Sequence, residues 1–120
     1  MSTPTRPAPF AAESHDLDGL VLGPLADDVA VIAERMATLD PWASMGRPPE
    51  SFVAYMTRPM AATFRYGLRL DGRPVGFLSL RHPFMRGPYI ETIALFPEAQ
   101  RRGFGRRIVE WMGREVAGEA

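Results

Sequence analysis

The last third of the chain carries the pattern that most restricts its fold. Residues 89–96 have the apolar, β-branched composition of a strand, Pro97 ends it, and a helix begins near Arg102. The apolar residues of this helix form a single stripe at helical spacing: Phe104, Ile108, Trp111, Met112 and Val116. Such a helix has to bury its stripe against another layer, so the segment predicts a domain in which a helix covers a sheet.

A β-hairpin is expected before that segment. Residues 62–70 alternate apolar and polar side chains, residues 75–80 form a second short apolar run, and Asp71-Gly72 between them favours a tight turn. His82-Pro83 is expected to end the second strand.

The first half of the chain predicts one strand and two helices. The strand is expected at residues 20–22, the first helix over residues 29–36, and the second from Pro49 onward. The whole order predicts an α+β fold with an antiparallel sheet of four strands flanked by helices. Residues 1–15 are rich in Pro, Ala, Ser and Thr, so they are expected to be a flexible tail before a domain at residues 16–120.

Composition excludes several classes of function. The chain has no cysteine and no lysine, which excludes disulfides, a cysteine nucleophile and a lysine Schiff base. Its two histidines lie far apart, so no metal site is expected. A net charge of zero disfavours a nucleic-acid partner. No apolar run is long enough for a membrane span and no signal peptide is visible, so a cytoplasmic protein without membrane contact is expected.

Two glycines stand one residue apart where the last helix begins. Gly103 and Gly105 lack side chains, so a ligand can approach the backbone closely there. The first amide groups of a helix have no internal partner, and with the helix dipole they attract anions. Neighbouring arginines can clamp phosphate oxygens. The segment therefore predicts a pyrophosphate-binding turn, but not a Rossmann fingerprint, because Ile108 takes the place of the third glycine.

The order strand, proline and then Gln-x-x-Gly-x-Gly resembles the signature of the GNAT superfamily of N-acetyltransferases, with Gln100 as the glutamine. The likeness extends over roughly residues 19 to 118. It implies an acyl-CoA-dependent N-acetyltransferase that transfers an acetyl group from acetyl-CoA to a primary amine, of a small molecule or a protein N-terminus. It also implies direct attack by the amine, with no covalent enzyme intermediate.

The resemblance assigns roles to two segments. The main chain near the end of the strand would pair with the pantetheine arm and polarise the thioester carbonyl, and the turn would hold the pyrophosphate. The residues so assigned to acetyl-CoA are Ile93, Ala94, Leu95, Gln100, Arg101, Arg102, Gly103, Phe104, Gly105 and Arg106.

Other residues keep two interpretations. Glu91 either acts as, or positions, a catalytic base, or is an ordinary polar residue of the strand. The aromatic and methionine side chains of the second helical region either line an acceptor pocket or belong to the core: Trp42, Phe52, Tyr55 and Met56.

Family members usually continue with a strand, a helix that often carries a general-acid tyrosine, and two closing strands. This chain ends at Ala120, so the C-terminal part of the fold is expected to be missing and the activity of the chain alone is left open. The alternative is a non-catalytic CoA-binding or dimerising module derived from the same fold. One edge of strand 89–96 would lack a neighbour, so a homo-oligomer or a second chain is expected to cover it.

Overall fold

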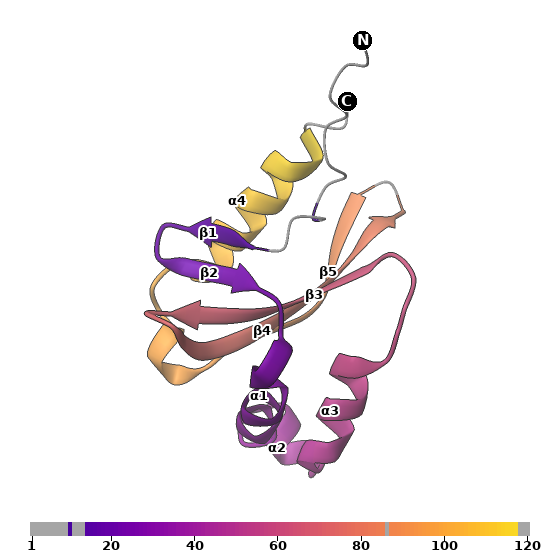
Figure 1. Cartoon of the computed structure of the whole chain (residues 1–120), viewed down its shortest axis with the longest axis vertical. Helices are drawn as coiled ribbons and strands as arrows, with labels where there is room; N and C mark the ends of the chain where they lie inside the picture. The colour runs from indigo at the N-terminus through magenta and orange to yellow at the C-terminus, as the bar shows by residue number, and fades with distance from the viewer. Residues whose placement is uncertain (1–9, 11–13, 86, 118–120) are drawn as a thin grey trace.

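The computed structural model of the chain describes residue 10 and residues 14–85 and 87–117. These residues form a five-stranded antiparallel sheet in the order β1-β2-β3-β4-β5 (Figure 1). The strands are β1 (His15–Leu17), β2 (Leu20–Gly23), β3 (Thr63–Leu70), β4 (Arg73–Phe84) and β5 (Gly87–Leu95). The helices are α1 (Val29–Met36), α2 (Trp42–Met45), α3 (Pro49–Thr57) and α4 (Phe104–Ala117), with short 3₁₀ turns η1 (Ala26–Asp28) and η2 (Pro97–Ala99). The predicted α+β class is confirmed.

The hairpin between β3 and β4 agrees with the sequence pattern. Leu70 pairs with Arg73, which leaves Asp71 and Gly72 as a two-residue turn. Both turn residues have positive φ angles, 50° and 77°, as a type I′ turn requires.

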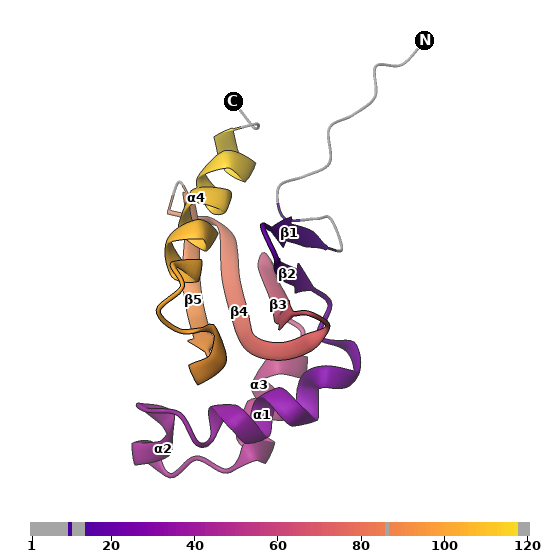
Figure 2. The same cartoon turned by 90° about the vertical axis from the view of Figure 1, so that its left-hand side faces the viewer.

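Each face of the sheet buries its own hydrophobic cluster, because side chains alternate along a strand. On β4, Leu78 packs into the cluster that includes Ile108 and Trp111 of α4. The preceding residue, Phe77, packs into the other cluster, with Ile32 of α1 and further residues of α3. Helix α4 therefore lies on one side of the sheet and α1 to α3 on the other, as Figures 1 and 2 show.

The N-terminal region departs from the expected tail. Most of residues 1–15 lie outside the described part of the chain, but Phe10 is buried and His15 begins β1. The Phe10 carbonyl accepts a hydrogen bond from the Tyr66 hydroxyl at 2.9 Å, and the His15 ring packs against Trp111. The sheet thus has five strands where four were predicted, and the interpretation as a tail is wrong for these two residues.

The predicted chain break at His82-Pro83 is also wrong, because β4 continues to Phe84. The pairing of β4 with β5 shifts register between Arg81 and Phe84, and a proline is tolerated at such an irregularity. No helix of the described residues is long and apolar enough to cross a membrane. The cytoplasmic location stays a prediction.

Candidate functional site

A groove runs along the C-terminal end of β5 to the start of α4. Its volume is about 440 Å³. One wall consists of three consecutive strand residues, and the first turn of α4 contributes Gly105. The opposite wall is the connection from α1 to α2. The lining residues are Leu39, Asp40, Pro41, Trp42, Ile93, Ala94, Leu95, Gln100 and Gly105. Five of the ten residues predicted to bind acetyl-CoA therefore line one groove.

The turn before α4 shapes the end of this groove. Gly103 has a φ of +76°, a conformation that glycine adopts without strain. The helix then starts with a hydrogen bond from the Arg107 N–H to the Gly103 carbonyl at 3.1 Å. The N–H groups of the preceding residues precede the regular helical pattern, as at the start of any helix, and are available to an anion.

Gly105, unlike Gly103, has a backbone conformation that any residue can adopt. Its φ is not in the left-handed region, and a Cβ added there would meet no protein atom within 4 Å. The fold itself therefore does not need glycine at this position. A side chain at position 105 would project into the groove, because Gly105 is part of the groove lining.

Close packing between β4 and β5 fixes the strand wall of the groove. A Cβ on Gly76 would lie 2.2 Å from the Ala94 carbonyl oxygen, so only glycine allows this approach. The Gln100 side-chain amide donates a hydrogen bond to the Leu95 carbonyl at 2.8 Å, and the Phe96 N–H donates to the Val75 carbonyl at 2.8 Å. The end of β5 and the turn after it are thus tied to each other and to β4.

An ion pair joins η2 to α1. The guanidinium of Arg35 donates two hydrogen bonds to the Glu98 carboxylate, one of them at 2.8 Å, and stacks 4.2 Å from the centre of the Phe96 ring. The hydrogen bonds from Arg35 hold the pKa of Glu98 at about 2, below its ordinary value of 4.5. This contact fixes the segment before the glycine turn against α1.

The remaining predicted residues divide between surface and core. Arg101 and Arg102 are exposed in the turn, and Arg106 is exposed on α4, where it pairs with Glu110 at 3.0 Å. Phe104 is buried in the core, so only its main chain is near the turn. The side chains of Arg101, Arg102 and Arg106 do not line the groove.

Glu91 occupies a β-bulge. Ser79 of β4 pairs with Thr92 and the next residue, Leu80, pairs with Ile90, which leaves Glu91 as an extra residue on β5. Neighbouring residues of a regular strand point to opposite faces, but a bulge re-aims a side chain. As a result Glu91 and Thr92 both reach the hydroxyl of Tyr55 on α3.

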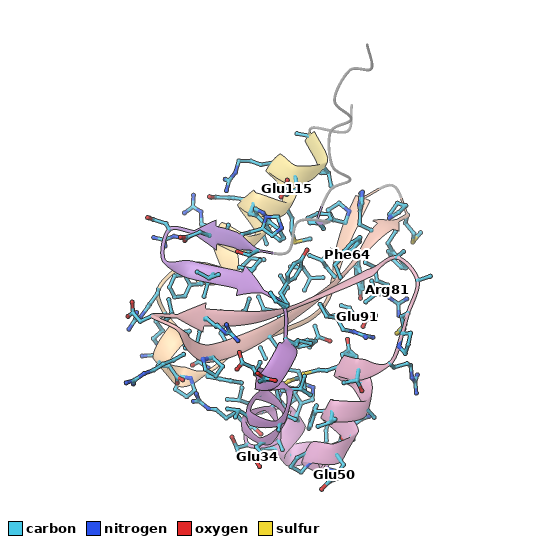
Figure 3. The ribbon with its side chains drawn as sticks, in the orientation of Figure 1. Glu34, Glu50, Phe64, Arg81, Glu91 and Glu115 are labelled. Atoms are coloured by element: carbon cyan, nitrogen blue, oxygen red, sulfur yellow. The ribbon has the colours of Figure 1, made fainter. Side chains whose placement is uncertain are left out.

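The bulge brings three polar side chains into contact with the Glu91 carboxylate and a fourth into contact with Tyr55. The Tyr55 hydroxyl donates a hydrogen bond to Glu91 and lies 2.9 Å from the Thr92 hydroxyl. Arg81 Nε lies 2.6 Å from the second Glu91 oxygen, and Ser79 donates a longer hydrogen bond of 3.4 Å. Figure 3 shows Arg81 and Glu91 together between the sheet and α3.

These contacts set the charge of the cluster. Burial favours a higher pKa for Glu91, but the hydrogen bond from Tyr55 and the charge of Arg81 outweigh it, so the Glu91 pKa is lower than usual. Burial and the hydrogen bond to Glu91 raise the Tyr55 pKa. At neutral pH the cluster therefore holds an ionised carboxylate and a protonated phenol.

A second pocket, called here the side pocket, opens beside this cluster, with a volume of about 210 Å³. It is lined by Met36, Trp42, Met45, Arg47, Ser51, Phe52, Tyr55 and Thr92. Three of the four residues considered for an acceptor pocket therefore line it, whereas Met56 is buried in the core. Trp42 lines both the groove and the side pocket, so the two spaces share this residue as part of their walls.

Sequence reasoning missed one wall of the groove and most of the polar cluster. Residues 39–41 follow α1, and their sequence indicates only a loop. It contains no motif typical of a ligand-binding site. Arg81 and Ser79 lie on β4 without a recognisable spacing to Glu91.

Within the described residues, no group of three or more histidine or acidic side chains could hold a metal ion.

Two comparisons with known proteins bear on this site. The comparison with curated proteins found no match. A model of the Acetyltransferase (GNAT) family matches residues 33–118, a range that includes α2, α3, the strands β3 to β5, the glycine turn and α4. That range covers well over half of the sequence and contains all of the groove and side-pocket lining, so the chain belongs to the GNAT acetyltransferase family.

Proposed function

We propose that the chain binds acetyl-CoA in the groove and transfers its acetyl group to a primary amine in the side pocket. The observation that supports this most is the composition of the groove, where the end of β5 and the first turn of α4 line one continuous space. Family membership suggests acetyl-CoA as the cosubstrate. The fit to this chain rests on the shape of the groove and on the free amides at its end.

The groove and its end offer neighbours to three parts of acetyl-CoA. The amides at Gly103 to Arg106 and the exposed arginines beside them suit the pyrophosphate. The end of β5 is an edge, since β4 is its one partner within the described sheet, so main-chain groups there can pair with the amides of the pantetheine arm. A main-chain N–H near Leu95 is the candidate for polarising the thioester carbonyl.

The reaction is written as direct transfer. The unprotonated amine attacks the thioester carbon, the C–N bond forms, and the C–S bond breaks as the tetrahedral intermediate collapses. An ammonium acceptor loses two protons in all, of which one ends on the CoA thiol and one in solvent. An amine of pKa near 10 is mostly protonated at pH 7, so the first deprotonation needs an acceptor group nearby.

Glu91 is our candidate for that nearby group. Its low pKa makes it a weak base, so the proposed role is to attract the ammonium and to pass a proton onward through water. Tyr55 holds the carboxylate in place and is a positioning residue in this scheme. The tyrosine remains protonated because its pKa is raised.

A second copy of the chain is the proposed partner at the other part of the β5 edge. Between β5 and α4 lies an apolar groove of about 540 Å³, lined by Pro88, Tyr89, Ile90, Val109, Met112, Gly113 and Val116. It contains no charged side chain, and Tyr89 and Val109 are 48% and 58% exposed. A two-fold axis would set the same apolar edge against itself, which needs no complementary charge. Acetyl-CoA would use residues 93–95, away from this contact.

The proposed activity is tested with the purified full chain. Acetyl-CoA should raise its melting temperature, because a ligand that binds only the folded state stabilises it. Release of free CoA thiol, together with mass spectrometry of the acceptor, should then report transfer. Stabilisation without transfer to any amine would favour the non-catalytic CoA-binding module, and no stabilisation at millimolar acetyl-CoA would contradict the proposal.

The proposed dimer has its own test. Sedimentation at micromolar concentration should show a dimer, and Val109→Arg should convert it to a monomer while leaving the acetyl-CoA response intact. A monomeric wild-type chain would refute the dimer without touching the activity.

A further inference from the structure

We propose that the side pocket selects an amine that also carries a carboxylate, that is, a small free amino acid, and that Arg47 binds this carboxylate. This inference rests on the proposed function, since it names the acceptor class for the same site. Arg47 lies in the loop between α2 and α3 and lines the side pocket together with Tyr55 and Thr92. The carboxylate and the amine of one small molecule would thus contact different walls.

The charges around the side pocket favour an anionic group on the acceptor. Arg47 is the one charged side chain among its lining residues, and within the described part of the chain it has no salt-bridge partner. Behind the pocket wall, the Glu91 carboxylate is matched by Arg81. A third guanidinium, that of Arg65, lies 5.4 Å from the centre of the Tyr55 ring. The lining of the side pocket and the contacts of Tyr55 and Glu91 thus include three guanidinium groups and one carboxylate.

This excess of positive charge around the side pocket discriminates between classes of amine. A polyamine or a lysine-rich peptide brings several positive charges and would be repelled by the excess of arginine. An amino acid brings one charge of each sign. Its ammonium can lie against Tyr55 and Thr92, in front of the Glu91 carboxylate that Tyr55 contacts, and its carboxylate can accept hydrogen bonds from Arg47.

The size and lining of the pocket limit the rest of the acceptor. A volume of about 210 Å³ suits a single small molecule rather than a long chain. Met36, Phe52 and Trp42 form its apolar walls and suit an aliphatic side chain. Trp42 also lines the groove, so an amine held beside it is next to the space proposed for the thioester.

The experiment compares leucine, leucinamide and putrescine as acceptors for the full chain with acetyl-CoA. Leucinamide lacks the carboxylate, and its less basic amine is unprotonated to a larger extent at neutral pH, so a preference for leucine cannot come from the supply of free amine. We expect kcat/KM for leucine to exceed that for leucinamide by roughly tenfold or more, in keeping with the strength of a charged hydrogen bond. Putrescine should be the poorest acceptor.

Variants assign the preference to one side chain. Arg47→Gln should raise KM for leucine roughly tenfold and remove its advantage over leucinamide, with little change in kcat. Arg47→Lys should retain part of the preference because it keeps the charge. Arg58→Gln is the matched control, since Arg58 is an exposed arginine at the other end of α3 and does not line the side pocket.

Four results of these experiments would overturn the inference about the acceptor. Equal use of leucine and leucinamide, a preference for putrescine, or an unchanged KM in Arg47→Gln would overturn the inference. So would acetyl-CoA binding without acetylation of any of the three compounds, which would leave cofactor binding standing. A wild-type chain that does not bind acetyl-CoA would instead overturn the proposed function, and the inference with it.

Discussion

Replacing Gly76 by alanine should destabilise the fold and weaken acetyl-CoA binding together. The new Cβ would lie 2.2 Å from the Ala94 carbonyl oxygen, more than 1 Å inside ordinary van der Waals contact, which begins at 3.4 Å. It would also lie 3.1 Å from a methyl carbon of Leu68. The closest atom belongs to the backbone of a paired strand, so it cannot move aside as a side-chain end can.

The expected cost follows from this contact. Overpacking in a core typically costs about 1–3 kcal/mol, and the loss of a neighbouring strand hydrogen bond adds roughly 1 kcal/mol. We therefore expect Gly76→Ala to lower the free energy of unfolding by about 3 kcal/mol, or the melting temperature by roughly 12 °C for a domain of this size. The strand wall of the groove includes Ala94, so acetyl-CoA affinity should fall as well.

Denaturant unfolding measures this cost. Gly23→Ala is the matched control, because Gly23 also lies in a strand and an added Cβ there meets no atom within 4 Å. The control should stay within about 1 kcal/mol of the wild type. If Gly76→Ala were as stable as the control, the close approach of β4 and β5 would not restrict this position to glycine.

Three further predictions concern single residues. Gly103→Ala should cost about 1–2 kcal/mol in thermal unfolding although no atom opposes the new Cβ, because alanine is strained at a φ of +76°; an unchanged stability would contradict the turn geometry. Tyr55→Phe should raise the Glu91 pKa, measured by carboxyl NMR, since it removes a hydrogen bond that lowers it; an unmoved titration would show that Tyr55 does not hold the carboxylate. The Glu98 pKa is depressed from 4.5 to about 2, so its ion pair with Arg35 stabilises the fold above pH 4.5 and is lost as pH falls towards 2. Glu98→Gln should therefore cost at most about 1 kcal/mol at neutral pH, because both side chains are partly exposed, and nothing near pH 2; a constant difference across this range would refute the assignment.

Local chemistry in the sequence predicts most of the sheet. Asp71-Gly72 predicts the β3–β4 hairpin, and the same signal at Asp18-Gly19 forms a second such turn between β1 and β2. Strand β1 before Asp18-Gly19 was not predicted, because the residues that precede this turn show no apolar period. Strand β1 is held by tertiary contacts instead, such as the packing of His15 on Trp111.

The glycine turn and the amphipathic helix were predictable because their signals are local. The start of the helix forms part of the groove, and the resemblance to the GNAT signature predicted five of the residues that line it. The side pocket and the Glu91 cluster were not predictable to the same degree. A single extra residue in β5 turns Glu91 towards Tyr55, and bulges of this kind depend on the pairing of two strands rather than on either sequence alone.

Acetyl-CoA binding at Gly105 tests the central claim most directly. Isothermal titration of the full chain with acetyl-CoA should show saturable binding with one site per chain. Gly105→Val should fold, because a Cβ there meets no protein atom within 4 Å, yet its branched side chain would fill the groove and abolish most of that binding. Equal affinity of the wild type and a folded Gly105→Val variant, or no binding by the wild type, would contradict the account.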